Sequence, residues 1–265
     1  MTSTTRRLSL AALATAGLWG LTGLSAAQAA GTPQRVAVVS LLGDELQVVT
    51  GSRKTGSHLD SNRRDAWPMP AGLMDGTSLV AVEKAGKQVA PESEFLLLKL
   101  PSARLFGDPL GQPEGPRYEI PAQLKPTLQQ IQATQLILIT PVRTDLRVQG
   151  VDFATGNGVL TGLGFYVDDL MRVRQINRAD LRETGEVARG FLAPYVYVKA
   201  SLIDARTGAV LAQKVVAKAE AIGGQRDEGV ADPFESLDGP SKVKVLTDML
   251  TAEVGEATKA LLAPR

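Results

Sequence analysis

Residue types that commonly carry catalysis are scarce in this chain. It contains no cysteine, which excludes thiolate nucleophiles, disulfides and cysteine-ligated metals. The single histidine, His58, lies in the polar segment GSRKTGSHLD. A general base there would need a folded pocket around it, and a solvated side chain is the simpler interpretation. There is no Gly-x-Ser-x-Gly nucleophile elbow. The sequence therefore indicates no catalytic residue, no metal site and no cofactor.

Carboxylates are the remaining catalytic candidates. Asp168 and Asp169 are adjacent, and neighbouring side chains on a strand point to opposite faces, so they would not form an acid–base pair. A second acidic segment, DEGVADPFESLDG, lacks the alternating ligand positions of a calcium loop. Solvated acids explain both groups. A periplasmic hydrolase with a carboxylate-based site is the alternative. The acids of the second segment are Glu228, Asp232, Glu235 and Asp238.

Binding is easier to motivate than catalysis. Arg63 and Arg64 could bind an anion or an acidic partner surface, although their polar neighbours also fit a solvated face. Trp67 either anchors its segment to the core or offers an aromatic platform to a ligand. Tyr166 would line the cavity of a small-molecule binding module, or pack within the sheet. The candidate binding residues are Trp67, Arg63, Arg64, Tyr166, Asp168 and Asp169.

The elements that must position these residues follow from hydrophobic patterning. Short apolar runs at residues 35–42, 95–100 and 135–142 predict buried strands. Residues 45–50 are expected to return as a hairpin partner of the first strand. Helices are expected from Asp75 or Thr77 to about residue 89, over 121–133 and over 240–262. This order predicts an α/β (α+β) fold with one mixed sheet, helices mainly on one face, and a long C-terminal amphipathic helix.

Residues 193–220 give the clearest structural signal. Two runs of alternating residues flank a short turn that contains Gly208, which is typical of a β-hairpin. Asp204 can bond the turn backbone, and Thr207 completes the turn. Upstream, the glycines of GNGVLTGLGFYV alternate with apolar residues, which favours a strand over a phosphate-binding loop. Residues 168–190 form a charged arm, either an extended hairpin or a short helix.

The N-terminus predicts export. Arg6 and Arg7 precede an apolar stretch and the small-residue site Ala27–Gln28–Ala29, the pattern of a cleavable signal peptide over residues 1–29. Residues 30–265 are then expected to form a single domain in the periplasm, with extracellular secretion as the alternative. Removing two arginines leaves 27 basic and 28 acidic residues, a net charge of −1. Nucleic acid is therefore not an expected partner, and no transmembrane helix is expected in the mature chain.

Three segments together resemble the small α/β domains of bacterial envelope accessory proteins. They are the strand RVAVVSLL, the hairpin SLIDARTGAVL and the terminal helix KVKVLTDMLTAEVGEATKALL. The chain is similar in this order to the curli secretion lipoproteins, the lipoprotein activators of peptidoglycan synthases and the N-terminal domain of the Tol translocation protein. The shared turn pattern falls on Ile203, Asp204, Thr207 and Gly208. Unlike the lipoprotein members, this chain has no cysteine.

The resemblance implies a noncatalytic periplasmic domain that binds or assembles with an envelope protein. The chain also resembles exported proteins of proteobacteria. The resemblance brings no functional residues with it, and the sequence indicates no oligomeric state. The hypotheses carried forward are an envelope binding or assembly protein, a hydrolase and a small-molecule binding module.

Overall fold

The computed structural model of the chain is organised around one long strand, β8 (Arg182–Asp204). The structure describes residues 34–51, 60–100, 116–149, 158–177, 182–223 and 233–263, with backbone only at 169–177 and 182–189. The expected signal peptide, His58, Glu228 and Asp232 lie outside the described residues.

Strand β8 pairs along both of its edges. On one edge its first part pairs with β7 (Val159–Asn177), and its last part pairs with β5 (Gln135–Pro141), both antiparallel. The other edge pairs with β9 (Val210–Ala219) and with the short β10 (Ile222–Gly223). Every other strand of the described sheet reaches β8 through these neighbours.

The sheet therefore divides into two wings that share β8. In one wing β5 pairs in parallel with β1 (Arg35–Ser40), which pairs in parallel with β4 (Glu94–Leu98). In the other wing β7 pairs in parallel with β2 (Glu45–Thr50), and β3 (Arg63–Pro68) runs antiparallel at its edge. A short strand, β6 (Arg143–Asp145), also pairs with β7.

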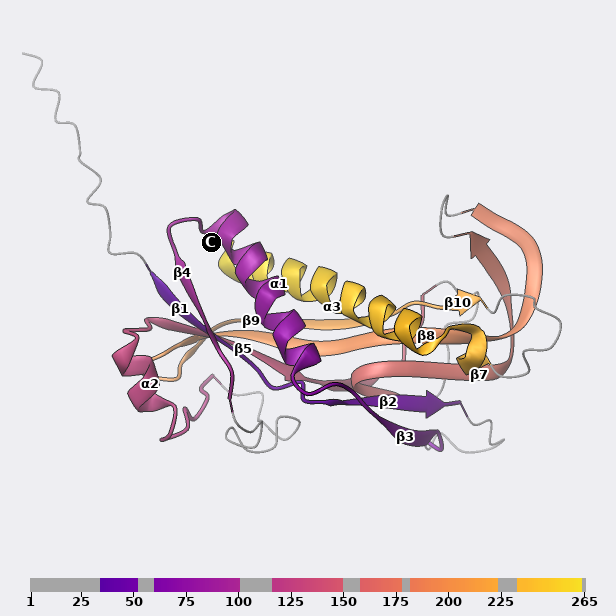
Figure 1. Cartoon of the computed structure of the whole chain (residues 1–265), viewed down its shortest axis with the longest axis horizontal. Coiled ribbons are helices and arrows are strands. Elements are labelled where there is room, and N and C mark those ends of the chain that lie inside the picture. The colour runs from indigo at the N-terminus through magenta and orange to yellow at the C-terminus, as the bar shows by residue number, and fades with distance from the viewer. Residues whose placement is uncertain are drawn as a thin grey trace, which may run out of the picture. The chain divides into compact units, whose positions relative to one another are not determined.

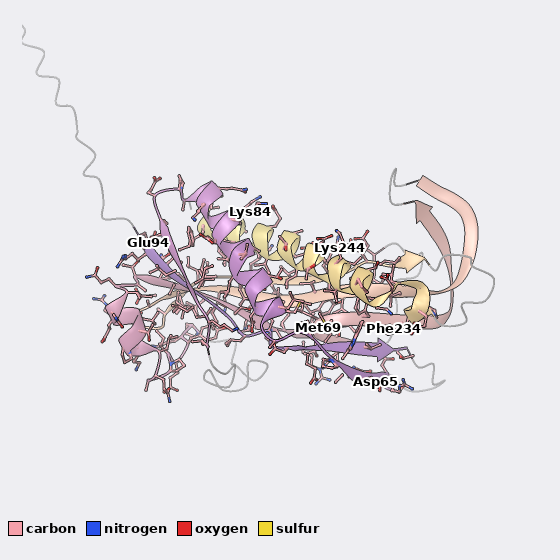
Figure 2. The ribbon with its side chains drawn as sticks, viewed as in Figure 1. Asp65, Met69, Lys84, Glu94, Phe234 and Lys244 are labelled. Carbon is pink, nitrogen blue, oxygen red and sulfur yellow. The ribbon has the colours of Figure 1, made fainter. Side chains whose placement is uncertain are left out.

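Two helices cover one face of this sheet. Figure 1 shows α1 (Leu73–Val89) and α3 (Gly239–Leu262) side by side. Leu246, Leu250 and Val254 point from α3 into a core shared with β1 and β8. Charged residues such as Lys84 and Lys244 lie on the outer sides of the helices (Figure 2). The predicted fold class, a mixed sheet with helices mainly on one face and a long C-terminal helix, is confirmed.

The opposite face carries two smaller apolar clusters. One packs Ile120, Leu124 and Leu128, around the short helix α2 (Lys125–Gln130), against β1, β5 and the end of β8. The other packs Leu146 and Val148 against aromatic residues of β7 and β8. Helix α2 is shorter than the span 121–133 predicted for it; Pro126 lies in its first turn, where a missing N–H costs no helical bond.

Two local predictions are wrong. Strand β2 does not return along β1; it runs in the same direction as its partner β7, in the other wing, after a short connection in which Gly43 has a φ of 76°. Asp75 does not cap α1, which begins at Leu73 after Gly72. Its carboxylate instead accepts hydrogen bonds from the Ser40 hydroxyl (2.6 Å) and the Leu42 N–H (2.8 Å). These bonds attach α1 to the end of β1.

A close approach between β2 and β7 leads to a first prediction. A Cβ atom at Gly164 would overlap the backbone oxygen of Gln47 and lie 2.7 Å from the Tyr195 hydroxyl. Because a backbone cannot rotate away, Gly164→Ala is expected to lower the free energy of unfolding by about 2–3 kcal/mol in chemical denaturation.

Gly76→Ala is the matched control, since its Cβ would meet nothing within 4 Å on α1. Alanine has the higher helix propensity, so this variant is expected to be more stable by about 0.5–1 kcal/mol. Equal effects of the two substitutions would contradict the proposed close packing at Gly164.

Candidate functional site

The residues singled out from the sequence do not form one cluster. Trp67 packs in the core under α3, whereas Tyr166 belongs to the apolar cluster on the opposite face of the sheet. Strand β2 separates β3, which carries Trp67, from β7, which carries Tyr166. A single ligand site built from all of these residues is therefore not present in the described structure.

Trp67 belongs to an aromatic group beneath the start of α3. Its ring centroid lies 6.2 Å from that of Phe165 and 5.5 Å from that of Phe234. The Lys242 ammonium lies 3.9 Å from the Phe234 ring centroid, with only 4% of the residue exposed. This arrangement attaches β3 to the core through ring packing and a cation–π contact.

The two arginines of β3 have carboxylate partners within the chain. Arg63 forms an exposed ion pair with Asp65 at 2.8 Å. Arg64 pairs with Asp60 and donates to the Val159 carbonyl at 3.0 Å. Burial would raise the pKa of Asp60, but the hydrogen bond from Arg64 and two backbone N–H groups lower it overall. Arg64 thus connects β3 to the start of β7.

Tyr166 and Asp168 are both buried in β7, at 2% and 7% exposure. The Tyr166 ring lies 5.9 Å from that of Phe191, as in core packing. The side chain of Asp169 is not among those described. Backbone pairing of β7 with β8 continues as far as Asn177 and Arg182, so the described parts of the arm, residues 168–177 and 182–190, are paired antiparallel strands rather than a helix.

The turn between β8 and β9 is held by one carboxylate. Asp204 accepts hydrogen bonds from the N–H of Arg206 (3.1 Å), the N–H of Thr207 (2.7 Å) and the Thr207 hydroxyl (2.8 Å). The bond from the Thr207 N–H is the main reason that the pKa of Asp204 is lowered. Gly208, with φ 76°, provides the left-handed conformation that closes the turn.

The outer edge of β9 is the feature that the sequence did not single out. At one end, the Val210 N–H donates to the Pro116 carbonyl at 2.9 Å. At the other end, the Gln149 N–H donates to the Ala219 carbonyl at 2.9 Å. Between these two contacts, no described strand pairs with residues 211–218 on that side. Among the described residues, β9 thus has an open edge of ordinary strand length, bounded at both ends by these contacts.

Two large apolar side chains are exposed along this open edge. Leu211 and Val215 are 40% and 50% exposed. Lys214 is also exposed, and the Lys218 ammonium bonds the Gln149 side chain at 2.5 Å. Lysine on an edge discourages uncontrolled strand pairing. The edge therefore combines apolar contact area with a feature that restricts which strands can pair.

Among the described carboxyl groups, the partly buried Asp75 is a candidate for acid chemistry. Burial raises the pKa of Asp75, although hydrogen bonds from Ser40 and the Leu42 N–H act in the opposite direction. Both hydrogen bonds attach α1 to the end of β1, so the role of Asp75 is structural.

No cluster of three or more His, Asp or Glu residues suited to a metal ion occurs within the described residues. No helix in the described part of the chain is long and apolar enough to cross a membrane.

A raised pKa at Asp75 has a defined effect on stability. The folded state holds this proton more tightly than the unfolded state, so the ionised group costs stability near neutral pH. We expect the free energy of unfolding of the wild type to rise, relative to Asp75→Asn, as pH falls from neutral toward the raised pKa, which lies above the ordinary 3.8. Urea denaturation across this range measures the difference.

Asp248→Asn, which removes an exposed carboxylate from α3, is the control. If the wild type and Asp75→Asn show parallel pH profiles, Asp75 is not the group that destabilises the folded chain at neutral pH.

Comparisons with known proteins assign no family. No family model matches the chain, and no curated protein sequence does. Solved structures give distant likenesses. PelC from Paraburkholderia phytofirmans, solved as a dodecamer, is 11% identical with a TM-score of 0.32 over 88% of this chain and 91% of that one.

Two further solved structures have similar values. Protein XCC0632 from Xanthomonas campestris is 8% identical with a TM-score of 0.37 over 88% of each chain. Lipoprotein GNA1162 from Neisseria meningitidis is 10% identical with a TM-score of 0.26, over 84% of this chain and 99% of that one. Similarity at this level does not transfer a function to this chain.

Proposed function

We propose that this chain is an exported, noncatalytic binding or assembly protein of the cell envelope that acts through protein–protein contacts. The observation that carries the proposal is the open outer edge of β9 over residues 211–218. The proposed occupant is one extended segment of a partner protein, added as a further strand beside β9.

Backbone directions on β9 support strand addition. The Ala219 carbonyl bonds Gln149 on the outer side, whereas the Glu220 N–H bonds Pro194 on the β8 side. Because successive residues of a strand direct their backbone groups to opposite sides, Gln213, Val215 and Ala217 direct theirs outward. These residues present a regular row of donors and acceptors at the spacing that a partner strand requires.

The contacts at the two ends define the length of the partner segment. Pro116 occupies the edge beside Val210, and Gln149 occupies it beside Ala219. A segment of ordinary strand length fits between them. Exposed Leu211 and Val215 add apolar contact area, which provides affinity beyond the backbone bonds. An apolar side chain on the partner opposite Val215 is therefore expected.

Placement at the envelope rests on the N-terminal sequence. The basic, apolar and small-residue regions of residues 1–29 have the order of a secretory signal.

We expect the exported protein to begin at Ala30, because cleavage follows the small residue at Ala29. Mass spectrometry of the N-terminal peptide from the periplasmic fraction measures this. Recovery of the intact N-terminus from that fraction would contradict cleavage.

Strand addition predicts a specific effect of proline in β9. Val215→Pro removes an outward N–H and leaves the ladder with β8 intact, because the N–H of Val215 does not point toward β8. The variant is expected to fold and to lose capture of the partner in cells, measured by photo-cross-linking from position 213 followed by mass spectrometry.

Val215→Thr is the matched control, since it keeps the N–H and the β-branched shape. It is expected to retain the cross-linked partner. Circular dichroism and the melting temperature establish that both variants are folded. If folded Val215→Pro captures the same partner as the wild type, binding does not use the backbone edge of β9.

A small-molecule binding module is the second candidate function. The supporting observation is a cationic pocket beside the turn between β8 and β9. It is lined by Arg117, Lys125 and Arg206. The hydrolase alternative has no comparable support among the described residues, because the partly buried carboxylate of Asp75 accepts structural hydrogen bonds from Ser40 and Leu42.

A further inference from the structure

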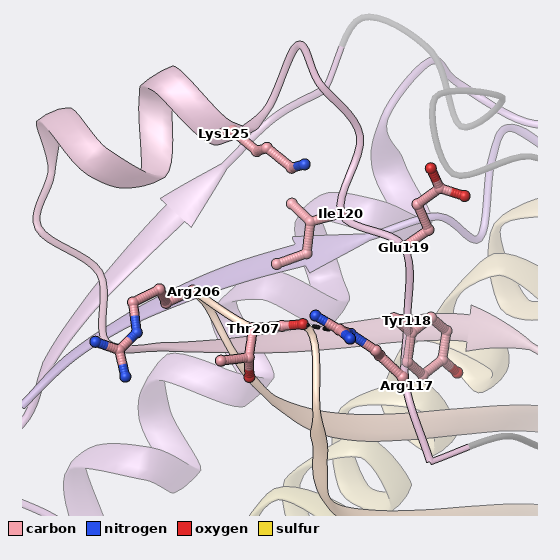
Figure 3. A pocket seen from close by; sticks show the side chains of 7 residues that line it. All are labelled: Arg117, Tyr118, Glu119, Ile120, Lys125, Arg206 and Thr207. Carbon is pink, nitrogen blue, oxygen red and sulfur yellow. Dashed lines mark hydrogen bonds between the residues drawn. The ribbon is translucent and has the colours of Figure 1, made fainter.

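A pocket of about 350 Å³ lies where the β8–β9 turn meets the segment before α2. Its walls come from residues 117–120, from Lys125 at the start of α2, and from Arg206 and Thr207 in the turn. Figure 3 shows the Lys125 ammonium and the Arg117 guanidinium on either side of Ile120, with Arg206 further along the turn. The volume is within the range of small-molecule sites.

The pocket lining is strongly cationic. Three of its side chains, Arg117, Lys125 and Arg206, carry positive charge, against the single carboxylate of Glu119. The whole chain has a formal net charge of only +1, so this local excess of positive charge is not a general property of the surface. Cations gathered around a concave surface attract anions into it.

Arg117 is held in position before any ligand arrives. Its Nε donates to the Thr207 carbonyl at 2.7 Å, and Asp204 fixes Thr207 through the turn. The backbone alongside is also fixed, because the Tyr118 N–H donates to the Gly208 carbonyl at 2.8 Å. The terminal nitrogens of Arg117 have no partner among the described residues. A positioned guanidinium with both terminal nitrogens available is suited to bidentate binding of a carboxylate or phosphate.

A buried cation lies behind the same wall. Lys199 is 8% exposed, and its ammonium lies 5.7 Å from the centroid of the Tyr118 ring. No carboxylate within the described residues forms an ion pair with it. Because a buried charge is screened little by water, Lys199 adds to the positive potential around Tyr118, which lines the pocket.

The geometry points to this pocket as a binding site for a small organic anion that carries a carboxylate or phosphate group. Arg117 binds the anionic group through its terminal nitrogens, Lys125 adds a second charge, and buried Ile120 contacts the apolar part of the ligand. This site is separate from the open edge of β9 between residues 211 and 218, so either site can exist without the other.

Isothermal titration calorimetry on the full-length mature chain tests the site. Citrate and glucose 6-phosphate are the two anionic probes, and they distinguish a carboxylate ligand from a phosphate ligand. Glucose is the neutral control, and sodium chloride is matched for ionic strength. We expect saturable binding of at least one anionic probe, with no binding of glucose.

Two variants locate the binding. Lys125→Gln removes a side chain with no hydrogen bond or ion pair within the described residues, so its folding is not at risk. Arg117→Gln removes the guanidinium. Each is expected to weaken binding of the active probe by roughly tenfold, the effect of losing one charge-assisted contact. Arg117→Lys, which keeps the charge but loses the planar fork, should lie between Arg117→Gln and the wild type.

Lys84→Gln, on the outer side of α1, removes the same charge away from the pocket and is expected to bind like the wild type. Either of two results overturns the proposal. One is the absence of saturable binding of both anions at millimolar concentration. The other is equal weakening by Lys84→Gln and Lys125→Gln, which would show that only the net charge matters. Neither result bears on capture of a partner strand by β9.

Discussion

The whole sheet depends on one strand, which forms backbone hydrogen bonds along both edges and packs side chains on both faces. Strand β8 supplies backbone partners to β7, β5 and β9, and its side chains alternate between the core under the helices and the clusters on the other face. Val196 and Val198 point toward α3, while Tyr195 and Tyr197 point away from it. A one-residue slip of this strand would exchange the two sets, so its register is fixed from both sides.

The remaining architecture follows from sharing that strand between two wings. β1 and β2 run in the same direction but belong to different wings, and the short connection between them includes Gly43 with a positive φ. The close approach at Gly164 brings β2 against β7 and gives the Tyr195 hydroxyl room to reach the Gln47 carbonyl at 3.5 Å. With one edge of β8 divided between two wings, β9 covers the other edge from Tyr195 to Ile203. Within the described residues, the outer side of β9 remains open over residues 211–218.

Much of the fold could be predicted from the sequence, because local patterns determine it. The alternation over residues 193–220, with glycine at the turn, indicates the β8–β9 hairpin, and the 3–4 spacing of Leu246, Leu250 and Val254 indicates α3. The partner of β2 could not be predicted, because a parallel pairing between residues as distant in sequence as Gln47 and Gly164 leaves no local signal. Asp75 was misjudged because its hydrogen-bond partners, Ser40 at the end of β1 and Leu42 just beyond it, are more than thirty positions away in the sequence.

The candidate sites were harder to predict than the fold. Whether a strand edge is open depends on which other strands pair with it. The sequence of β9 alone has only the pattern of an ordinary half-buried strand. The cationic pocket brings together Arg117, Lys125 and Arg206. Arg206 is distant in sequence from the other two, and none of the three stands in a recognisable motif. By contrast, Trp67 and Tyr166 attracted notice as aromatic residues, and both pack within the apolar clusters of the described structure.

The position of β8 late in the chain has a consequence for how the protein acquires its structure. During synthesis β1, β4 and β5 all emerge before β8, and their pairings leave one edge of β5 uncovered until β8 arrives some sixty residues later. α3, which covers the apolar face of β8, is made last. Folding is therefore expected to be slow and dominated by distant contacts. The newly made chain would benefit from a chaperone that shields the early strands until the final third is complete.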